Sequence, residues 1–98
     1  IVEATTVMSA GDYQLSQNFP NPFNPTTTFS FAMKNAELTS VKVYDLLGQE
    51  VATLFNGITQ PSQMYTLTFD GRDLSSGIYF YTLRSPSRNE VKKMMLMK

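Results

Sequence analysis

The sequence predicts an all-β fold, an antiparallel immunoglobulin-like β-sandwich of about seven strands with no significant helix. Apolar residues recur at every second position in several short stretches, which is the period of a half-buried strand. Segments rich in Gly, Pro, Asn and Ser separate these stretches at spacings typical of sandwich domains. No stretch keeps a helical period for three turns, so crossover helices and a parallel sheet are not expected.

Three candidate strands lie in the first half of the chain, at residues 13–17, 26–33 and 38–45. In the last two, alternation gathers apolar side chains on one face. These faces consist of Phe29, Phe31 and Met33 in the second strand and of Val41 and Val43 in the third.

A hairpin is predicted around "DLLGQ". Asp45 can accept backbone N–H bonds as the turn opens, and Gly48 supplies the positive φ of a type I turn followed by a bulge. Residues 50–55 then fold back on the preceding strand. Further strands are expected at residues 64–69 and 78–84, before a last strand that runs to the end of the chain.

The stretch "GIYFY" refines the sandwich prediction. It begins at Gly77 and has the pattern found at the start of strand F in immunoglobulin-like domains, where a tyrosine bonds back to the preceding corner. Tyr79 is expected to be that tyrosine. Tyr81 is then expected in the inward position that a disulfide cysteine occupies in antibody domains. The alternative is that Tyr79 is simply one more aromatic residue of a central strand.

Residues 18–25, "NFPNPFNP", combine three prolines with two phenylalanines. Proline lacks the N–H donor and fixes φ, so this segment cannot be a central strand and is expected to protect an edge. We expect Phe19 and Phe23 to anchor the segment along the sandwich. The alternative is that the two rings form an exposed ledge that binds sugar.

Residues 84–98 form a basic strip with Glu90 as the one acidic residue. Such a strip either meets an acidic partner or is the solvated side of an edge strand. Alternation leaves open which face of the last strand is buried. The basic residues are Arg84, Arg88, Lys92, Lys93 and Lys98, and the competing apolar faces are Met94 with Leu96 and Val91 with Met95 and Met97.

Composition excludes several kinds of site. The chain has no Cys and no His, which rules out disulfides, thiolate or imidazole zinc sites and histidine-based triads. Asp70 and Asp73 are the closest pair of carboxylates for calcium, although Asp-Gly is also ordinary turn composition. The net charge is zero and no apolar run has the length of a membrane helix. We expect no catalysis, cofactor, metal, nucleic acid or membrane insertion.

The length of 98 residues suits a single small domain. The chain begins at Ile1 with neither an initiator methionine nor a signal peptide, so we expect a piece of a longer protein. Residues 1–12 are interpreted as a linker tail, in which residues 5–8 could pair as a short strand. Residues 13–98 are interpreted as the domain.

Four motifs, taken in order, carry a resemblance to a known family. They are "YQLSQNFPNPFNPTTTFSF", "VKVYDLLGQEVATLF", "FDGRDLSSGIYFYTL" and the terminal "KKMMLMK". In this order and spacing they resemble the C-terminal sorting domain, type A, of proteins exported by the type IX secretion system of certain Gram-negative bacteria. The family is also similar to the immunoglobulin-like domain of flagellar hook-capping proteins. The resemblance covers residues 13–98.

The resemblance implies a non-catalytic secretion signal that directs an attached cargo protein across the outer membrane. Cargo would pass through the periplasm and end secreted or at the cell surface. The implied partners are the outer-membrane translocon, a sortase-like peptidase that cleaves in or before residues 1–12, and the preceding cargo domain. By position in the motifs, the residues of the sorting signal would be Pro20, Asn21, Pro22, Phe23, Gly48, Val51, Gly77, Tyr79, Lys93, Met94, Leu96 and Lys98.

Two other functions are compatible with the residues. One is an immunoglobulin-like adhesion or carbohydrate-binding module that stays attached to an enzyme. The other is an accessory domain that stabilises its neighbour. For the sorting function, we expect the basic last strand to offer a backbone edge for strand addition, or its charges for an acidic groove.

Overall fold

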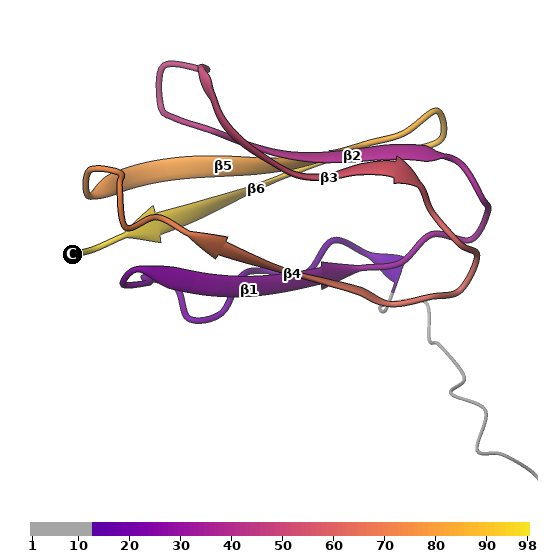
Figure 1. The fold of residues 1–98 in the computed structure, drawn as a ribbon, viewed down its shortest axis with the longest axis horizontal. Coiled ribbons are helices and arrows are strands. Elements are labelled where there is room, and N and C mark those ends of the chain that lie inside the picture. The colour runs from indigo at the N-terminus through magenta and orange to yellow at the C-terminus, as the bar shows by residue number, and fades with distance from the viewer. Residues whose placement is uncertain (1–12) are drawn as a thin grey trace, which may run out of the picture.

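The computed structural model describes residues 13–98, which contain six β-strands and no α-helix. Strand pairing is antiparallel throughout, in a sheet of order β1-β4 and a sheet of order β3-β2-β5-β6. The two sheets face each other as layers (Figure 1), which confirms the predicted sandwich. No helix of residues 13–98 has the length and hydrophobicity needed to span a membrane. The strands are β1 (Thr26–Phe31), β2 (Leu38–Tyr44), β3 (Glu50–Ile58), β4 (Tyr65–Asp70), β5 (Gly77–Arg84) and β6 (Asn89–Leu96).

The strand expected at residues 13–17 is absent, so six strands are present where about seven were expected. Ser16 N donates to Ser30 O at 2.8 Å, but Ser30 N donates to Ser16 Oγ in place of a carbonyl oxygen, which interrupts a regular ladder. Residues 13–25, here called the strap, therefore run beside β1 as irregular chain. The linker expected at residues 1–12, with its candidate strand at residues 5–8, lies outside the described residues.

The core lies between the two sheets and is built as alternation predicts. Phe29 of β1 and Val41 and Val43 of β2 are buried. Tyr81 of β5 is also fully buried, and its ring stacks on that of Phe29 with 4.1 Å between the ring centroids. An aromatic pair therefore joins the sheets where antibody domains place a disulfide, as expected for Tyr81.

β3 departs from simple alternation because it contains two bulges. Register shifts against β2 leave Val51 and Leu54 without partner residues on that strand. Each extra residue changes the face that the following side chains point to. Half-buried side chains consequently come in adjacent pairs, Val51 with Ala52 and Leu54 with Phe55.

The turn between β2 and β3 forms as predicted. Asp45 Oδ1 accepts hydrogen bonds from Leu47 N and Gln49 N, both at 2.9 Å. Gly48 has a φ of +84°, in the left-handed region that favours glycine. The turn rises from the four-stranded sheet on the side away from β1 and β4 (Figure 1).

Candidate functional site

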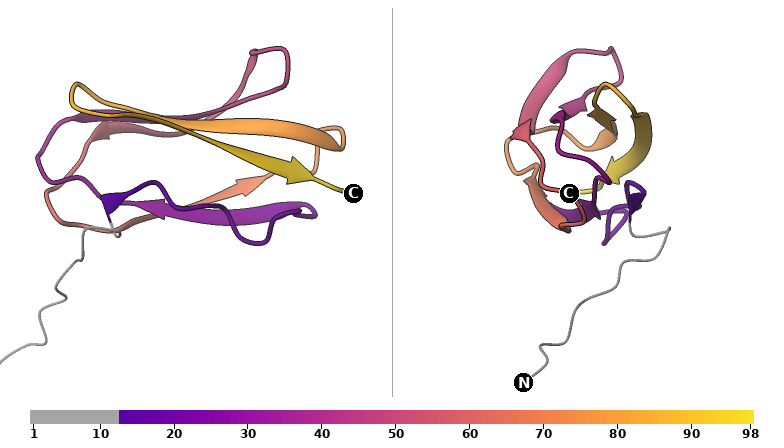
Figure 2. Two further views of the ribbon diagram at one scale, coloured as in Figure 1. Left: turned by 180° about the vertical axis from the view of Figure 1, so that it is seen from behind. Right: turned by 90° about the vertical axis from the view of Figure 1, so that its right-hand side faces the viewer.

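The strap crosses the open side of the sandwich from one sheet to the other. Near its start it pairs with β1, where Phe19 and Thr28 exchange backbone hydrogen bonds of 2.8 and 3.0 Å. Further along it reaches the opposite sheet and pairs with β6 around Phe23. The right-hand view of Figure 2 shows the end of β6 beside the indigo strap.

Four hydrogen bonds hold the strap to the outer edge of β6 between Lys93 and Met97. Phe23 N donates to Met95 O and Met97 N donates to Phe23 O, each at 2.9 Å. Met95 N donates to Asn21 Oδ1 at 3.0 Å, and Gln17 Nε2 donates to Lys93 O at 2.9 Å. The strap protects this edge, as its prolines led us to expect.

The same bonds limit where strand addition at the last strand can occur. β6 is the final strand of its sheet, and the strap occupies backbone groups of Lys93, Met95 and Met97 on its outer edge. A partner strand could pair with this part of the edge only by displacing the strap. Strand addition along the first half of β6 stays a prediction.

The two phenylalanines of the strap have opposite environments. The Phe23 side chain is 1% exposed and packs edge-on against the ring of Phe69, with 6.0 Å between centroids. Phe23 is therefore an anchor, as expected. Phe19 is 80% exposed, so the expectation that it is a second anchor was wrong. Its backbone pairs with Thr28, and this pairing turns its side chain away from the core. With Phe23 buried, the two rings do not form a shared sugar-binding ledge.

Asn18 fixes the shape of the strap and was not singled out from the sequence. Its side chain is buried and its Nδ2 donates to Thr27 Oγ1 at 3.0 Å and to Pro20 O at 3.2 Å. Thr27 Oγ1 in turn donates to Pro20 O at 2.8 Å. The buried Asn–Thr pair therefore satisfies a carbonyl in a segment whose prolines supply no N–H donors.

The buried face of β6 is that of Met94 and Leu96, which settles a point that alternation left open. Val91, Met95 and Met97 lie on the opposite face and are exposed. Lys93 is also exposed and has no ion-pair partner among residues 13–98. Lys98 is exposed as well, and its Nζ donates to Arg72 O.

β5 supports β6 from inside the sheet. Gly77 pairs with Leu96 and Tyr79 pairs with Met94. The Tyr79 hydroxyl donates to Ser75 O at 2.7 Å, which confirms the predicted bond back to the preceding corner. Tyr79 is buried, so it shapes this region from within.

A further tyrosine ties the strap to the core. The Tyr81 hydroxyl donates to Ser16 O at 2.6 Å. Burial raises the pKa of Tyr81 to about 12, because the charged phenolate is poorly solvated in the core.

Gly71, in the loop after β4, is a second residue that sequence reasoning missed. A Cβ at this position would lie 3.0 Å from Leu96 Cδ2 and 3.4 Å from Phe23 Cε2. The absence of a side chain thus lets the strap and β6 pack together. The sequence signal available was "DG", which we interpreted only as turn composition.

Three motifs that are far apart in the sequence meet on one surface. Asn21 and Pro22 of the strap, Ile78 of β5, and Lys93, Met94 and Met95 of β6 line a shallow hollow of about 190 Å³. These six residues are here called the joined surface. Pro20, Phe23, Gly77, Tyr79, Leu96 and Lys98 lie beside or beneath it.

Gly48 and Val51 are not part of the joined surface. Gly48 lies in the β2–β3 turn and Val51 in the first bulge of β3. They are separated from β6 by β2 and β5 in the sheet order.

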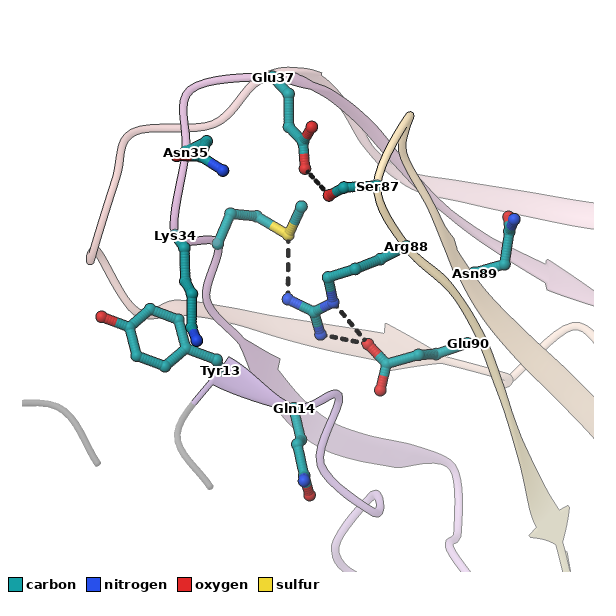
Figure 3. A pocket seen from close by; sticks show the side chains of 10 residues that line it. Tyr13, Gln14, Lys34, Asn35, Glu37, Ser87, Arg88, Asn89 and Glu90 are labelled. Carbon is teal, nitrogen blue, oxygen red and sulfur yellow. Dashed lines mark hydrogen bonds and ion pairs between the residues drawn. The ribbon is translucent and has the colours of Figure 1, made fainter. Parts of the chain in front are cut away.

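A larger hollow of about 590 Å³ lies at the other end of the sandwich (Figure 3). Its charged groups all have partners within the domain, and Lys34 Nζ lies 5.5 Å from the centroid of the Tyr13 ring. Arg88 pairs with Glu90 and also donates to Ala32 O at 2.6 Å, while Glu37 accepts from Ser85 Oγ at 3.2 Å and from Ser87 Oγ. The pairing explains the polar lining without invoking a ligand.

Asp70, weighed above as half of a calcium site, is paired with Arg72 at 2.5 Å. The hydrogen bond from the Arg72 side chain holds the pKa of the Asp70 carboxyl below its usual range. Among residues 13–98 no group of three or more Asp or Glu side chains is placed to hold a metal ion.

A family model described as "secretion system C-terminal sorting domain" matches residues 17–97. A search of curated proteins found no match. The matched span includes residues 17–25 of the strap, all six strands and the joined surface.

Proposed function

Because this chain belongs to the family of type IX secretion C-terminal sorting domains, we propose that its joined surface is what the export machinery recognises. The domain is a sorting signal for export across the outer membrane, to the secreted or cell-surface state. It acts on the protein to which it is attached, through the type IX machinery. Domains of this kind are generally non-catalytic.

The observation that carries the proposal is that the strap, β5 and β6 build one surface from three separate motifs. A partner that binds there contacts residues 21–22, 78 and 93–95 at once. Met94 and Leu96 anchor β6 from below, and Phe23 anchors the strap. Recognition thus depends on the folded domain and not on a linear peptide.

The partner's contact surface should be apolar with acidic groups. Met95 is partly exposed and Ile78 half-buried beside the uncompensated charge of Lys93. We assign this contact to the outer-membrane translocon, which the domain meets from the periplasm. Gly48 and Val51 contribute to recognition indirectly, by shaping the β2–β3 hairpin. Removal by a sortase-like peptidase, in or before residues 1–12, completes the proposed sequence of events.

The test is export of a reporter with a periplasmic signal peptide at its front and the 98-residue chain at its end, in a host with a working type IX system. Lys93→Glu reverses one exposed charge on the joined surface. Arg84→Glu makes the same change on β5, at an exposed position outside that surface. We expect Lys93→Glu to retain the reporter in the periplasm and Arg84→Glu to leave export normal.

Removal of residues 90–98 should abolish export, but this deletion also destroys β6. The point variants are therefore compared only if their thermal unfolding matches that of the parent chain. Normal export of a folded Lys93→Glu variant would contradict the joined surface as the recognised site. Failure of the parent reporter to leave the periplasm, while other cargo is exported, would contradict the sorting function itself. In that case the attached adhesion or carbohydrate-binding module becomes the leading function.

A further inference from the structure

The β2–β3 turn presents two adjacent leucines to solvent. Leu46 is 68% exposed and Leu47 is 85% exposed. Such turn positions are ordinarily polar, because neither side chain is buried by the hairpin. The fold requires Asp45 and Gly48 at this turn, through their hydrogen bonds and positive φ, but it requires leucine at neither position between them.

The turn is already ordered before any partner binds. Asp45 N donates to Gln49 O at 2.9 Å and Gly48 N donates to Asp45 O at 3.0 Å. Asp45 Oδ1 holds two further backbone N–H groups. Binding at this turn therefore loses little backbone entropy, which favours a small but preorganised contact.

The turn is also continuous with the outer face of the four-stranded sheet. Tyr44, the last residue of β2, pairs with Phe80, and Phe80 pairs with Lys93 of the joined surface. Two strand spacings, about 10 Å, thus separate the base of the turn from Lys93. The turn rises on the side away from β1 and β4 (Figures 1 and 2), so one partner can contact both the turn and Lys93.

The charges beside the leucines indicate what kind of partner fits. Asp45 has no cationic partner among residues 13–98, whereas Glu50 is paired with Lys42 at 3.1 Å. The tip of the turn, Leu46 and Leu47, is therefore apolar, and the unpaired carboxylate of Asp45 gives its rim a net negative charge. An anionic membrane surface would repel it, while a protein pocket with a basic rim would complement it.

We propose that Leu46 and Leu47 insert into an apolar pocket, rimmed by Lys or Arg side chains, on the protein component of the export machinery that receives the domain. This inference rests on the proposed function and adds a second contact to the joined surface. The joined surface meets acidic groups, and the turn meets basic ones. The two contacts of opposite charge fix the orientation of the domain on its partner.

The test uses the reporter that carries the full 98-residue chain. Leu46→Ser combined with Leu47→Asn keeps residue types that suit a turn. Its matched control is Leu38→Ser combined with Ile58→Asn, a cross-strand pair that is 58% and 59% exposed at the far end of the same hairpin. We expect the turn variant to lower export by about tenfold, which corresponds to a loss of about 1.4 kcal/mol of binding free energy. The control variant should leave export unchanged.

The charge of the rim is tested at Gln49, which is exposed and beside the turn. Gln49→Lys should lower export more than Gln49→Glu, and the reverse order would overturn the basic pocket. Purified chain is also incubated with vesicles of neutral and of anionic phospholipid, and its mass in solution is measured. Leucine-dependent binding to vesicles, or leucine-dependent dimers, would overturn the proposal in favour of a lipid surface or a second copy.

The outcomes separate this inference from the proposed function. If the folded turn variant is exported normally while Lys93→Glu is retained, the leucine contact is wrong and the joined surface stands. If the turn variant is retained and Lys93→Glu is exported, the recognised site lies at the turn. Normal export of both variants would contradict both proposals.

Discussion

The two lateral sides of this sandwich are closed by different means. On one side the strap lies across the gap, bonded through its backbone and amide side chains to β1 and β6. There the core residues are almost fully buried. On the other side β3 and β4 come together by side-chain packing, and the aromatic rings of Phe31, Phe55 and Tyr65 fill the space between them.

The two sides therefore differ in how strongly their packing depends on particular residues. Hydrogen bonds are directional, so the strap side depends on particular residues at particular positions. On the β3–β4 side, half-buried groups such as Phe55 and Tyr65 pack around the buried ring of Phe31, and such apolar contacts can adjust to a change of shape at smaller cost. The side with demanding geometry is also the side that carries the joined surface. We therefore expect substitutions on the strap side to have larger effects than matched ones on the β3–β4 side.

The largest effect is expected at Phe23. Phe23→Ala removes a fully buried ring and should lower the free energy of unfolding by about 3–5 kcal/mol. Phe19→Ala, four residues earlier, removes an exposed ring and should change it by less than about 0.5 kcal/mol. Urea denaturation of both variants measures the difference, and similar losses would contradict the assignment of Phe23, and not Phe19, as an anchor.

Alkaline pH should weaken the strap side through Tyr81. Its ordinary pKa is 10.0 and burial raises the pKa to about 12. Because the folded pKa is the higher one, the stability from a neutral Tyr81 is fully present below pH 10. It declines as the pH rises from 10 to 12, by about 2–3 kcal/mol in total.

Thermal unfolding measured across this pH range checks the Tyr81 prediction. Tyr81→Phe has no ionisable hydroxyl, so its stability should be lower at neutral pH, where the bond to Ser16 O is lost. The same variant should lose less stability between pH 10 and 12 than the parent chain. An equal decline in both would assign the effect to other groups.

A smaller effect is expected for glycine substitutions. Gly71→Ala places a Cβ 3.0 Å from Leu96 Cδ2 and should destabilise the domain by about 1–2 kcal/mol. Gly57→Ala, on β3, meets no atom within 4 Å and should be neutral or stabilise by about 0.5 kcal/mol. Melting temperatures of the two variants compare the sides directly, and a destabilising Gly57→Ala would break the comparison.

The smallest effect is expected from a single strap hydrogen bond. Asn21→Ala removes the acceptor for Met95 N and should cost about 0.5–1.5 kcal/mol. Asn56→Ala on β3 removes an exposed amide that makes no hydrogen bond among the described residues, so stability should stay the same. Hydrogen exchange at Met95 N–H gives a local readout: it should be faster in Asn21→Ala and unchanged in Asn56→Ala.

Features set by local chemistry could be predicted from the sequence. Alternation predicted the buried faces of β1 and β2, and Asp45 and Gly48 predicted the hairpin turn. The pattern "GIYFY" predicted the hydrogen bond from Tyr79 back to the preceding corner. In each case the residue and its neighbours within a few positions decide the structure.

Features set by distant contacts could not be predicted. Phe19 and Phe23 have nearly the same neighbours, and only the pairing of Phe23 with β6 distinguishes them. Gly71 is important for the same reason, since the side chains nearest to it, those of Leu96 and Phe23, belong to β6 and to the strap. Likewise, "KKMMLMK" has apolar residues at both odd and even positions, so alternation alone does not identify its buried face. Contacts with the strap and β5 decide which face is buried.

The backbone bonds between Phe23 and β6 have a consequence for protein synthesis. Met95 and Met97 are made only after β1 to β5, yet their backbone groups bond directly to Phe23. The strap therefore cannot close on β6 until synthesis has passed Met97. A chain whose synthesis stops before β6 lacks the contact between the strap and β6 and cannot form the joined surface. Recognition of this surface thus also reports that β6 has been made.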